Sequence, residues 1–191
     1  MIKIGITGGI GSGKSVVCDI FLLHNIPVYD ADKEAKLLTN TSDVIRDKLI
    51  NHFGNVIYKD NELNRKLFGE LIFNNEDNLK IANSIIHPEV ANSFLKWCQN
   101  HSSSSIVAIE SAILIEAGFK KYIDKLITVC APKELRINRV VNRDNTSVAN
   151  IKARINNQIS EDERIRFSDY IIYNDNSRSL ILQVSDIINN L

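Results

Sequence analysis

The chain has 191 residues, of which 44% are hydrophobic and 24% are charged. This length suits one folded domain with a small insertion, and the apolar content is sufficient for a core. Lysines plus arginines number 23, as do aspartates plus glutamates, so the formal net charge is zero. This balance does not favour a general nucleic-acid-binding or membrane-surface function, and we expect neither nucleic acid nor membrane as a partner.

Apolar runs and cysteine spacing bear on the compartment and redox state of the protein. No apolar run approaches the roughly 18 to 20 residues that cross a bilayer, and residues 1–9 lack the pattern of a signal peptide. We therefore expect a cytoplasmic protein. Cys18, Cys98 and Cys130 are far apart and form no C-x-x-C pair, which predicts reduced core residues. The oligomeric state does not follow from composition. We expect a monomer.

Strands and helices alternate along the chain. Residues 3–7 are a short β-branched run ended by glycine, which predicts a buried strand, and residues 15–24 have helical apolar spacing. Residues 26–32 predict a second strand that ends in two acids. Further strands are predicted at 106–109, 125–132 and 169–175, and further helices at 133–142, 148–159 and 179–191. This alternation predicts an α/β fold with a doubly wound five-stranded parallel sheet.

A glycine-rich motif follows the first predicted strand. The stretch "GGIGSGKS" at residues 8–15 matches G-x-x-x-x-G-K-[ST], the P-loop of nucleoside-triphosphate-binding proteins. Its backbone N–H groups wrap a polyphosphate, and the following helix adds its positive N-terminal end. Lys14 should bridge the β- and γ-phosphates, and the Ser15 hydroxyl should ligate Mg²⁺. The candidate ATP-binding residues are Gly9, Ile10, Gly11, Ser12, Gly13, Lys14, Ser15 and Val16.

The rest of the chain narrows the class of P-loop protein. A GTPase would carry an N/T-K-x-D segment after a later strand, but "CAPKELR" follows the fourth predicted strand. A motor or transport ATPase usually needs further domains. The size suits a small-molecule kinase, which needs a core, an acceptor-binding region and a closing lid. A GTPase and a noncatalytic nucleotide-binding regulator remain the alternatives from other classes.

The helical pattern over residues 31–101 is far longer than one crossover requires. Residues 52–64 are predicted to interrupt it as a loop, and "HPEV" at residues 87–90 as a turn before another helix. We interpret residues 31–101 as an acceptor-binding region within a single domain that spans residues 1–191. The nucleotide-binding core then comprises residues 1–30, 102–135 and 168–191, and residues 136–160 form a lid.

Three arginines in the predicted lid share one helix face. Arg136, Arg139 and Arg143 are three and four residues apart, and no acid lies four residues from any of them. A solvated basic stripe is the alternative reading. With a P-loop upstream, we interpret them as groups that close over the transferring phosphoryl group. Arg136 has the weakest support of the three, and Ser147 is predicted to N-cap the helix that follows.

Acidic side chains follow two of the predicted strands, where a parallel sheet binds its ligands. Asp32 is the candidate general base for the attacking hydroxyl, whereas Asp30 either holds metal or water or caps the following helix. Glu110 ends the third strand and either holds the water shell of the metal or is a surface acid. His87 could contact an acceptor phosphate or cap a turn.

Taken in order, these motifs resemble those of the dephospho-coenzyme A kinase family over nearly the whole chain. The carrying segments are "IGITGGIGSGKS" (4–15), "DAD" (30–32), Arg65, "HP" (87–88), "ESAILIE" (110–116), the lid arginines, "RINNQ" (154–158) and "SDYIIYND" (168–175). The resemblance implies that the γ-phosphoryl group of ATP, with Mg²⁺, is transferred to the ribose 3′-hydroxyl of dephospho-coenzyme A. This would be the last step of coenzyme A synthesis.

The resemblance also implies residue roles. Asp32 would be the base, and Thr7, Arg65 and His87 would bind the acceptor with it. Lys14, Arg139 and Arg143 would be catalytic, and Arg143 would also bind ATP. Asn174 would lie near the adenine. Ser15 and Glu110 would lie near the metal.

The chain departs from the family pattern at three positions. Val16 stands where the family usually has threonine, Ala112 begins a stretch that is usually Pro-Leu-Leu, and Ser168 replaces an alanine. None of these positions is a proposed base or metal ligand.

The nearest alternatives within the same architecture are kinases acting on shikimate or gluconate, whose acceptor regions are shorter. Nucleoside monophosphate kinases also share an arginine-rich lid. A single-turnover phosphoryl-transfer assay would separate any of these kinases from a noncatalytic regulator.

Overall fold

The computed structural model describes all 191 residues. It contains a five-stranded parallel sheet with strand order β2-β5-β1-β6-β7, which confirms the predicted fold class. The strands are β1 (Ile2–Thr7), β2 (Val28–Asp30), β5 (Ile106–Glu110), β6 (Lys125–Cys130) and β7 (Tyr170–Tyr173). The chain divides into two compact units, a sheet unit (Met1–Tyr29 and Cys98–Leu191) and a helical unit (Asp30–Trp97).

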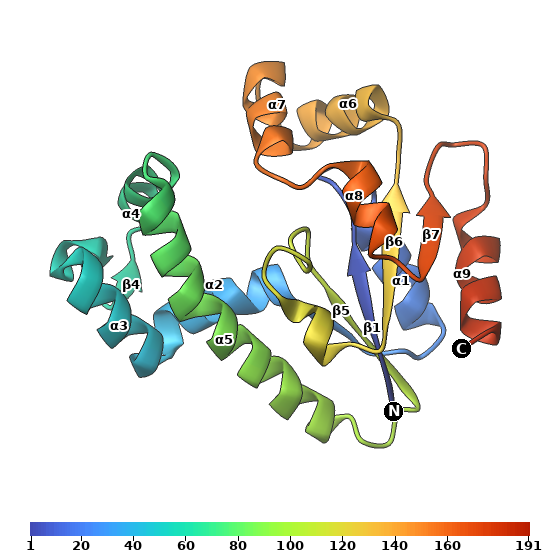
Figure 1. Cartoon of the computed structure of the whole chain (residues 1–191), viewed down its shortest axis with the longest axis horizontal. Coiled ribbons are helices and arrows are strands. Elements are labelled where there is room, and N and C mark those ends of the chain that lie inside the picture. Colours follow the sequence, from blue (N-terminus) through green and yellow to red (C-terminus); the bar gives the residue numbers. More distant parts are fainter. The chain divides into compact units, whose positions relative to one another are not determined.

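The core of the sheet unit lies between the strands and two helices. The first is α1 (Lys14–Leu23) and the second is α9 (Leu180–Asn189), which lie beside each other next to the sheet (Figure 1). Fully buried aliphatic and aromatic side chains from both helices and three strands form one cluster: Ile4, Ile6, Val17, Phe21, Ile127, Val129, Ile172 and Val184. Burial of this apolar surface fixes the orientation of β1 and α1, and therefore of the loop between them.

The second predicted strand is shorter than expected. It ends at Asp30, and α2 (Ala31–Thr41) begins at the next residue. The cause is local, because the Asp30 side chain accepts a 2.8 Å hydrogen bond from the backbone N–H of Lys33 and thereby caps the helix. Asp32 therefore lies in the first turn of a helix and not in a strand.

The helical unit contains α2, α3 (Asp43–Phe53), the 3₁₀ turn η1 (Asn55–Ile57), α4 (Arg65–Phe73) and most of α5 (Glu76–Asn100). Its core contains Ile45, Leu49, Ile57, Leu63 and Phe68. The segment predicted as a loop instead contains a hairpin of β3 (Tyr58–Lys59) and β4 (Glu62–Leu63). Its turn residues, Asp60 and Asn61, both have positive φ, which matches the primed turns that join short antiparallel strands.

The predicted turn at residues 87–90 is also wrong, because α5 continues through Pro88 as one 25-residue helix. Proline removes one backbone donor and disfavours a helix interior. Here side chains on both sides of Pro88 hold the helix together. Ile85 and Ile86 pack against the core of the helical unit, and Val90 and Ala91 are buried.

After β6 the chain forms α6 (Lys133–Asp144), α7 (Val148–Asn156) and α8 (Glu161–Arg166). Figure 1 shows α6 and α7 beyond the carboxyl ends of β1 and β6, the edge where open α/β sheets bind ligands. Ser147 caps α7 by accepting a hydrogen bond from Asn150 N–H, as predicted. Val140 and Ile151 are buried together in a small cluster, and Ile10 of the glycine-rich loop packs against this cluster.

Cys18, Cys98 and Cys130 are buried and form no disulfide, as predicted. Burial is the main reason why the pKa of Cys130 rises to about 12, so that its thiol stays protonated at neutral pH.

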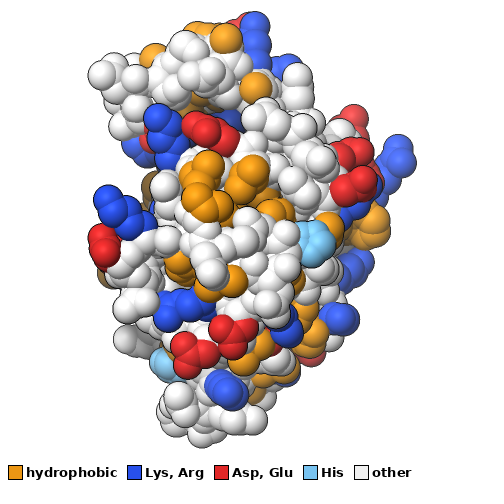
Figure 2. Space-filling model, turned by 90° about the vertical axis from the view of Figure 1, so that its left-hand side faces the viewer, with side chains coloured by type: hydrophobic (Ala, Val, Ile, Leu, Met, Phe, Trp, Pro, Cys, Tyr) orange, Lys and Arg blue, Asp and Glu red, His pale blue; other side chains and the backbone are white.

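None of the helices combines the length and apolar character that crossing a bilayer requires. On the face shown in Figure 2, basic and acidic side chains are interspersed.

Candidate active site

The glycine-rich motif lies between a strand and a helix, as a P-loop requires. β1 ends at Thr7 and α1 begins at Lys14, so residues 8–13 form the connecting loop. Gly13 has a φ of 94°, which residues with side chains rarely adopt, and no side chain caps α1. The N–H groups of the first helical turn are therefore available to an anion, which the positive helix end attracts.

The side chain of Lys14, the first residue of α1, reaches back to the start of this loop. Its Nζ donates a 3.2 Å hydrogen bond to the carbonyl oxygen of Gly8 and lies 3.4 Å from Glu110 Oε1. The side chains of Lys14 and Glu110 are only 12% and 16% exposed. Glu110 ends β5 and pairs in register with Ile6 of β1, so two neighbouring strands bring this acid to the loop. The predicted phosphate-binding lysine and the predicted metal-shell acid are thus in contact.

Two other predicted residues meet at the far end of the loop. Asn174 Nδ2 donates to the carbonyl oxygen of Ser12 at 2.8 Å, and its Oδ1 accepts from Arg139 Nη2 at 3.2 Å. Arg139 also donates to Asn176 Oδ1 at 2.9 Å, a contact the sequence did not indicate. A Cβ at position 13 would overlap the Asn174 amide, so the glycine is needed for this close approach as well as for its φ. Arg139 and Asn174 therefore form one network at Gly13.

A pair of arginines lies at the start of the loop, beside Gly9. Arg136 of α6 is 7% exposed and Arg164 of α8 is 1% exposed. A Cβ added at Gly9 would overlap Arg136 Nη1 and would lie 3.8 Å from Arg164 Nη1. Sequence reasoning missed Arg164 altogether, because it stands in the charged run "EDERIR", which reads as a solvated helix.

The segment between α7 and α8 is fastened to the loop and to the chain after β5. Gln158 Oε1 accepts a 3.0 Å hydrogen bond from the backbone N–H of Ile10. Glu116 Oε1 accepts a 3.2 Å bond from the N–H of Ile159. One amide of the glycine-rich loop is therefore already hydrogen-bonded by a side chain. Gln158 and Glu116 both stand in segments that resemble the kinase family.

Arg143 is paired with a neighbouring acid, contrary to the expectation from the sequence. No acid lies four residues away, but the adjacent Asp144 accepts two hydrogen bonds from the guanidinium, at 2.7 and 3.2 Å. The same carboxylate lies 3.4 Å from Arg154. These hydrogen bonds raise the pKa of Arg143 and lower that of Asp144. At 65% exposure, Arg143 is a solvent-facing, paired residue in this structure, and the expectation of an unneutralised stripe is wrong at this position.

The remaining residues predicted for this unit differ in accessibility. Thr7 and Ser12 are fully buried, and neither hydroxyl oxygen has a hydrogen-bond partner. Ser15 and Val16 are exposed in the first turn of α1, and Gly11 has a φ of 78°.

The helical unit contains three of the four predicted acceptor-side residues. Asp32 and His87 interact electrostatically: burial lowers the pKa of His87, and the charge of Asp32 acts in the opposite direction. Arg65 begins α4 and donates a 2.9 Å hydrogen bond to the carbonyl oxygen of Lys36 in α2. The helices α2, α4 and α5 therefore supply one predicted residue each. Asp30 acts as the cap of α2, which is the reading that the sequence left open.

Comparison with known proteins assigns the family. A family model described as dephospho-CoA kinase matches residues 2–179. The dephospho-CoA kinase of Bacteroides fragilis strain YCH46 is 41% identical over 187 residues, which cover 98% of this chain and 91% of that protein. A solved dephospho-CoA kinase from Campylobacter jejuni superposes with a TM-score of 0.71 at 28% identity, covering 98% of this chain and 96% of that one.

A more distant likeness concerns the fold alone. Shikimate kinase from Acinetobacter baumannii has a TM-score of 0.57 at 16% identity, covering 100% of this chain and 92% of that one. The two chains share the P-loop kinase architecture. The family assignment rests instead on the near full-length matches above, together with the glycine-rich loop and its lysine. The chain belongs to the dephospho-CoA kinase family, enzymes that phosphorylate dephospho-CoA with ATP in coenzyme A biosynthesis.

Proposed function

We propose that this chain transfers the γ-phosphoryl group of ATP to the 3′-hydroxyl of the ribose of dephospho-CoA, giving CoA and ADP. The observation that carries the proposal is the placement of Lys14, held between Gly8 and Glu110 at the start of an uncapped helix. An ammonium group and free helical N–H groups at one point favour the β- and γ-phosphates of a nucleoside triphosphate. Family membership supplies the acceptor.

On the nucleotide side, the loop of residues 9–16 cradles the phosphates, and Asn174 binds toward the adenosine end. Arg139, which the sequence assigned to the transferring phosphoryl group, is reassigned here to the same adenosine end. Support for the latter assignment comes from their shared network at Gly13. Arg143 belongs to the lid, residues 136–160. Its bidentate partner Asp144 must release it before it can contact ATP, because a guanidinium engaged with a carboxylate does not bind phosphate with the same nitrogen atoms.

Magnesium is the metal that this chemistry requires, and the residues present fit it. Mg²⁺ with a nucleotide uses one or two protein oxygens and otherwise phosphate and water oxygens, so no large protein cage is needed. Ser15 supplies a hydroxyl in the first turn of α1, and Glu110 supplies a carboxylate beside Lys14. When bound, the ion would neutralise charge on the β- and γ-phosphates.

On the acceptor side, we assign Asp32 as the general base that accepts the proton of the 3′-hydroxyl. Arg65, His87 and Thr7 bind the acceptor with it. The electrostatic contact between Asp32 and His87 supports a shared site in the helical unit. A carboxylate with an ordinary pKa is a weak base, but positioning outweighs proton affinity in phosphoryl transfer.

We further propose that the enzyme acts as a monomer in the cytoplasm, on small molecules alone, with residues 31–101 as the acceptor-binding region. The zero net charge and the interspersed charges on the face shown in Figure 2 support the absence of a nucleic-acid or membrane partner.

The test is an ADP-release assay with Mg-ATP and a panel of acceptors: dephospho-CoA, adenosine, AMP, CMP, shikimate and gluconate. Turnover on dephospho-CoA alone, with the new phosphate located on the 3′-oxygen by phosphorus NMR, is the expected result. Turnover on shikimate or a nucleotide instead would overturn the assigned substrate and retain the kinase. Tight ATP binding without turnover on any acceptor would favour the noncatalytic regulator.

A further inference from the structure

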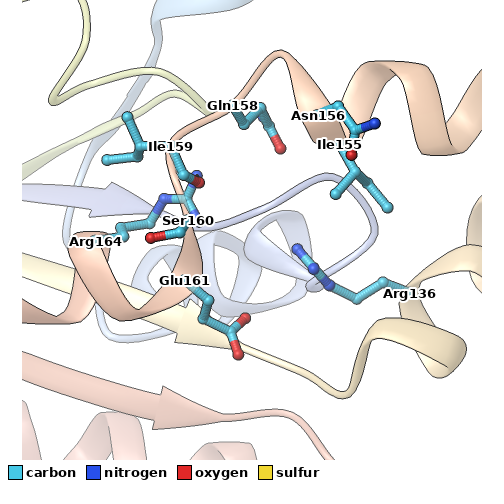
Figure 3. A pocket seen from close by; sticks show the side chains of 8 residues that line it. All are labelled: Arg136, Ile155, Asn156, Gln158, Ile159, Ser160, Glu161 and Arg164. Atoms are coloured by element: carbon cyan, nitrogen blue, oxygen red, sulfur yellow. The ribbon is translucent and has the colours of Figure 1, made fainter.

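Two arginines that the proposed function does not use are buried at the glycine-rich loop. The sequence indicated Arg136 only as the weakest of three lid arginines, and it did not indicate Arg164. Arg136 comes from α6 and Arg164 from α8, and their guanidinium groups approach Gly9 from two different elements. Both line a cavity of about 330 Å³ together with Gln158, Ser160 and Glu161. Figure 3 shows the Arg136 guanidinium pointing into this cavity, with Arg164 on its opposite side. The close approach to the loop is possible because position 9 has no side chain.

The hydrogen-bonding capacity of this arginine pair is not used up within the protein. The Nε atoms of Arg136 and Arg164 are buried and have no hydrogen-bond partner, although Arg164 Nη2 donates to the carbonyl oxygen of Ile159. A buried donor without a partner is costly, and a buried charge without a close counter-ion is more so. An anion in the cavity would satisfy both requirements.

The local charges lead to the same conclusion. Burial lowers the pKa of Arg164 and the like charge of Arg136 lowers it further, whereas Glu116 and Glu161 raise it through their charges. Glu116 already accepts the N–H of Ile159, and Glu161 Oε2 has no hydrogen-bond partner. Two acids therefore offset the two cations in part, without hydrogen-bonding either Nε.

The position of the pair along the loop identifies the phosphate. Arg139 and Asn174 occupy the Gly13 end, which we assigned to the adenosine side. Lys14, which reaches the β- and γ-phosphates in P-loop proteins, has its Nζ at Gly8. The arginine pair stands at Gly9, next to that end. The phosphate nearest to the pair would consequently be the terminal one.

We propose that Arg136 and Arg164 bind the γ-phosphoryl group of ATP and hold it during transfer, a catalytic role that rests on the proposed function. In this step the bond from the γ-phosphorus to the oxygen it shares with the β-phosphate breaks, leaving ADP. A bond to the 3′-oxygen forms, and the hydroxyl proton passes to Asp32. Both arginines stay protonated and donate hydrogen bonds to the equatorial oxygens, where the charge of the transition state is spread.

Nucleotide titrations by calorimetry, with Mg²⁺ and without dephospho-CoA, test the pair. The ligands are ADP and AMPPNP, an ATP analogue whose γ-phosphate is not transferred. Arg136→Gln is expected to weaken AMPPNP binding by about tenfold or more and to change ADP binding by less than about twofold, because only AMPPNP carries the contacted group. Arg139→Gln should weaken both ligands similarly. Arg166→Gln, an exposed arginine on α8, is the matched control and should change neither.

Arg164 is more deeply buried, so Arg164→Lys keeps the charge while it removes the planar fork. It should show the same selective loss for AMPPNP. If this variant does not give a cooperative thermal melt, the Arg136→Gln result decides alone. Equal losses for ADP and AMPPNP in Arg136→Gln, or no loss for either, would overturn the proposal. Because these titrations contain no acceptor, they stand even if the acceptor panel shows another substrate.

Discussion

Two aspartates two positions apart illustrate how local geometry separates similar residues. Asp30 uses its carboxylate to cap α2 by accepting a hydrogen bond from the backbone N–H of Lys33. Asp32 lies one half-turn further on, where its charge acts on His87. The sequence shows both acids but not which one turns toward its own backbone, since a cap depends on the residue at which the helix begins.

Replacing Asp32 therefore tests the proposed base. Asp32→Asn preserves size but cannot accept the hydroxyl proton, so kcat with dephospho-CoA should fall about 100-fold. Affinity for ADP should stay the same, because this residue is not among those proposed to bind ATP. Initial rates at saturating substrate, with an ADP titration, measure both quantities.

Asp30→Asn is the matched control. Asparagine caps helices as well as aspartate does, so kcat and the melting temperature should both remain near the wild-type values. If Asp30→Asn loses as much activity as Asp32→Asn, the assignment of the base to Asp32 fails.

His87 gives a pH prediction. Its pKa in the folded protein lies below the ordinary value of 6.5, chiefly because of burial. Between these two pKa values the unfolded chain binds a proton more readily than the folded protein does. The stabilisation that neutral His87 gives is therefore complete above the ordinary pKa and is lost as the pH falls through the pKa of His87 in the folded protein. His87→Gln should therefore reduce the drop in melting temperature between about pH 7.5 and about pH 5. Exposed His52, replaced by Gln, is the control, and an undiminished drop in His87→Gln would contradict the argument.

At the scale of elements, the helix α5 shows where tertiary packing overrides a local signal. "HPEV" indicates a turn because proline disfavours a helix interior, yet α5 runs through Pro88. The hairpin at Asp60 and Asn61 was missed for a related reason, since strands of two residues are too short to show periodicity. By contrast, β1, the glycine-rich loop and α1 were predictable, because buried strand, glycine positions and helical spacing all agree there.

The proline in α5 should carry a measurable cost. Pro88→Ala restores one backbone donor without adding bulk, so we expect the free energy of unfolding to rise by about 1–3 kcal/mol. Pro88→Gly restores the same donor but adds backbone entropy to the unfolded chain, and should be about 1 kcal/mol less stable than Pro88→Ala. Urea denaturation followed by circular dichroism measures both. A less stable Pro88→Ala would mean that the proline itself contributes packing that alanine cannot replace.

At the scale of the whole molecule, the fold class followed from the sequence, but the arrangement around the loop did not. Arg136 and Arg164 are 28 positions apart, so no pattern in the chain shows that both reach Gly9. Likewise, Asn174 and Ser12 are joined only because β7 and the loop meet at one edge of the sheet. Contacts of this kind depend on topology, whereas the P-loop depends on adjacent residues, and this difference determines which parts of the site sequence reasoning could find.

The proposal that the helical unit binds the acceptor and the sheet unit binds the nucleotide leads to a prediction for hydrogen exchange. If residues 31–101 bind the acceptor, dephospho-CoA should slow amide exchange in peptides from α2, α4 and α5 of the helical unit. AMPPNP with Mg²⁺ should instead protect residues 8–16 and the segment 136–160, since a ligand stabilises most strongly the regions whose opening would release it. Adenosine at equal concentration controls for nonspecific protection. Protection by dephospho-CoA confined to the sheet unit would contradict the assignment of the helical unit to the acceptor, while leaving the nucleotide site unaffected.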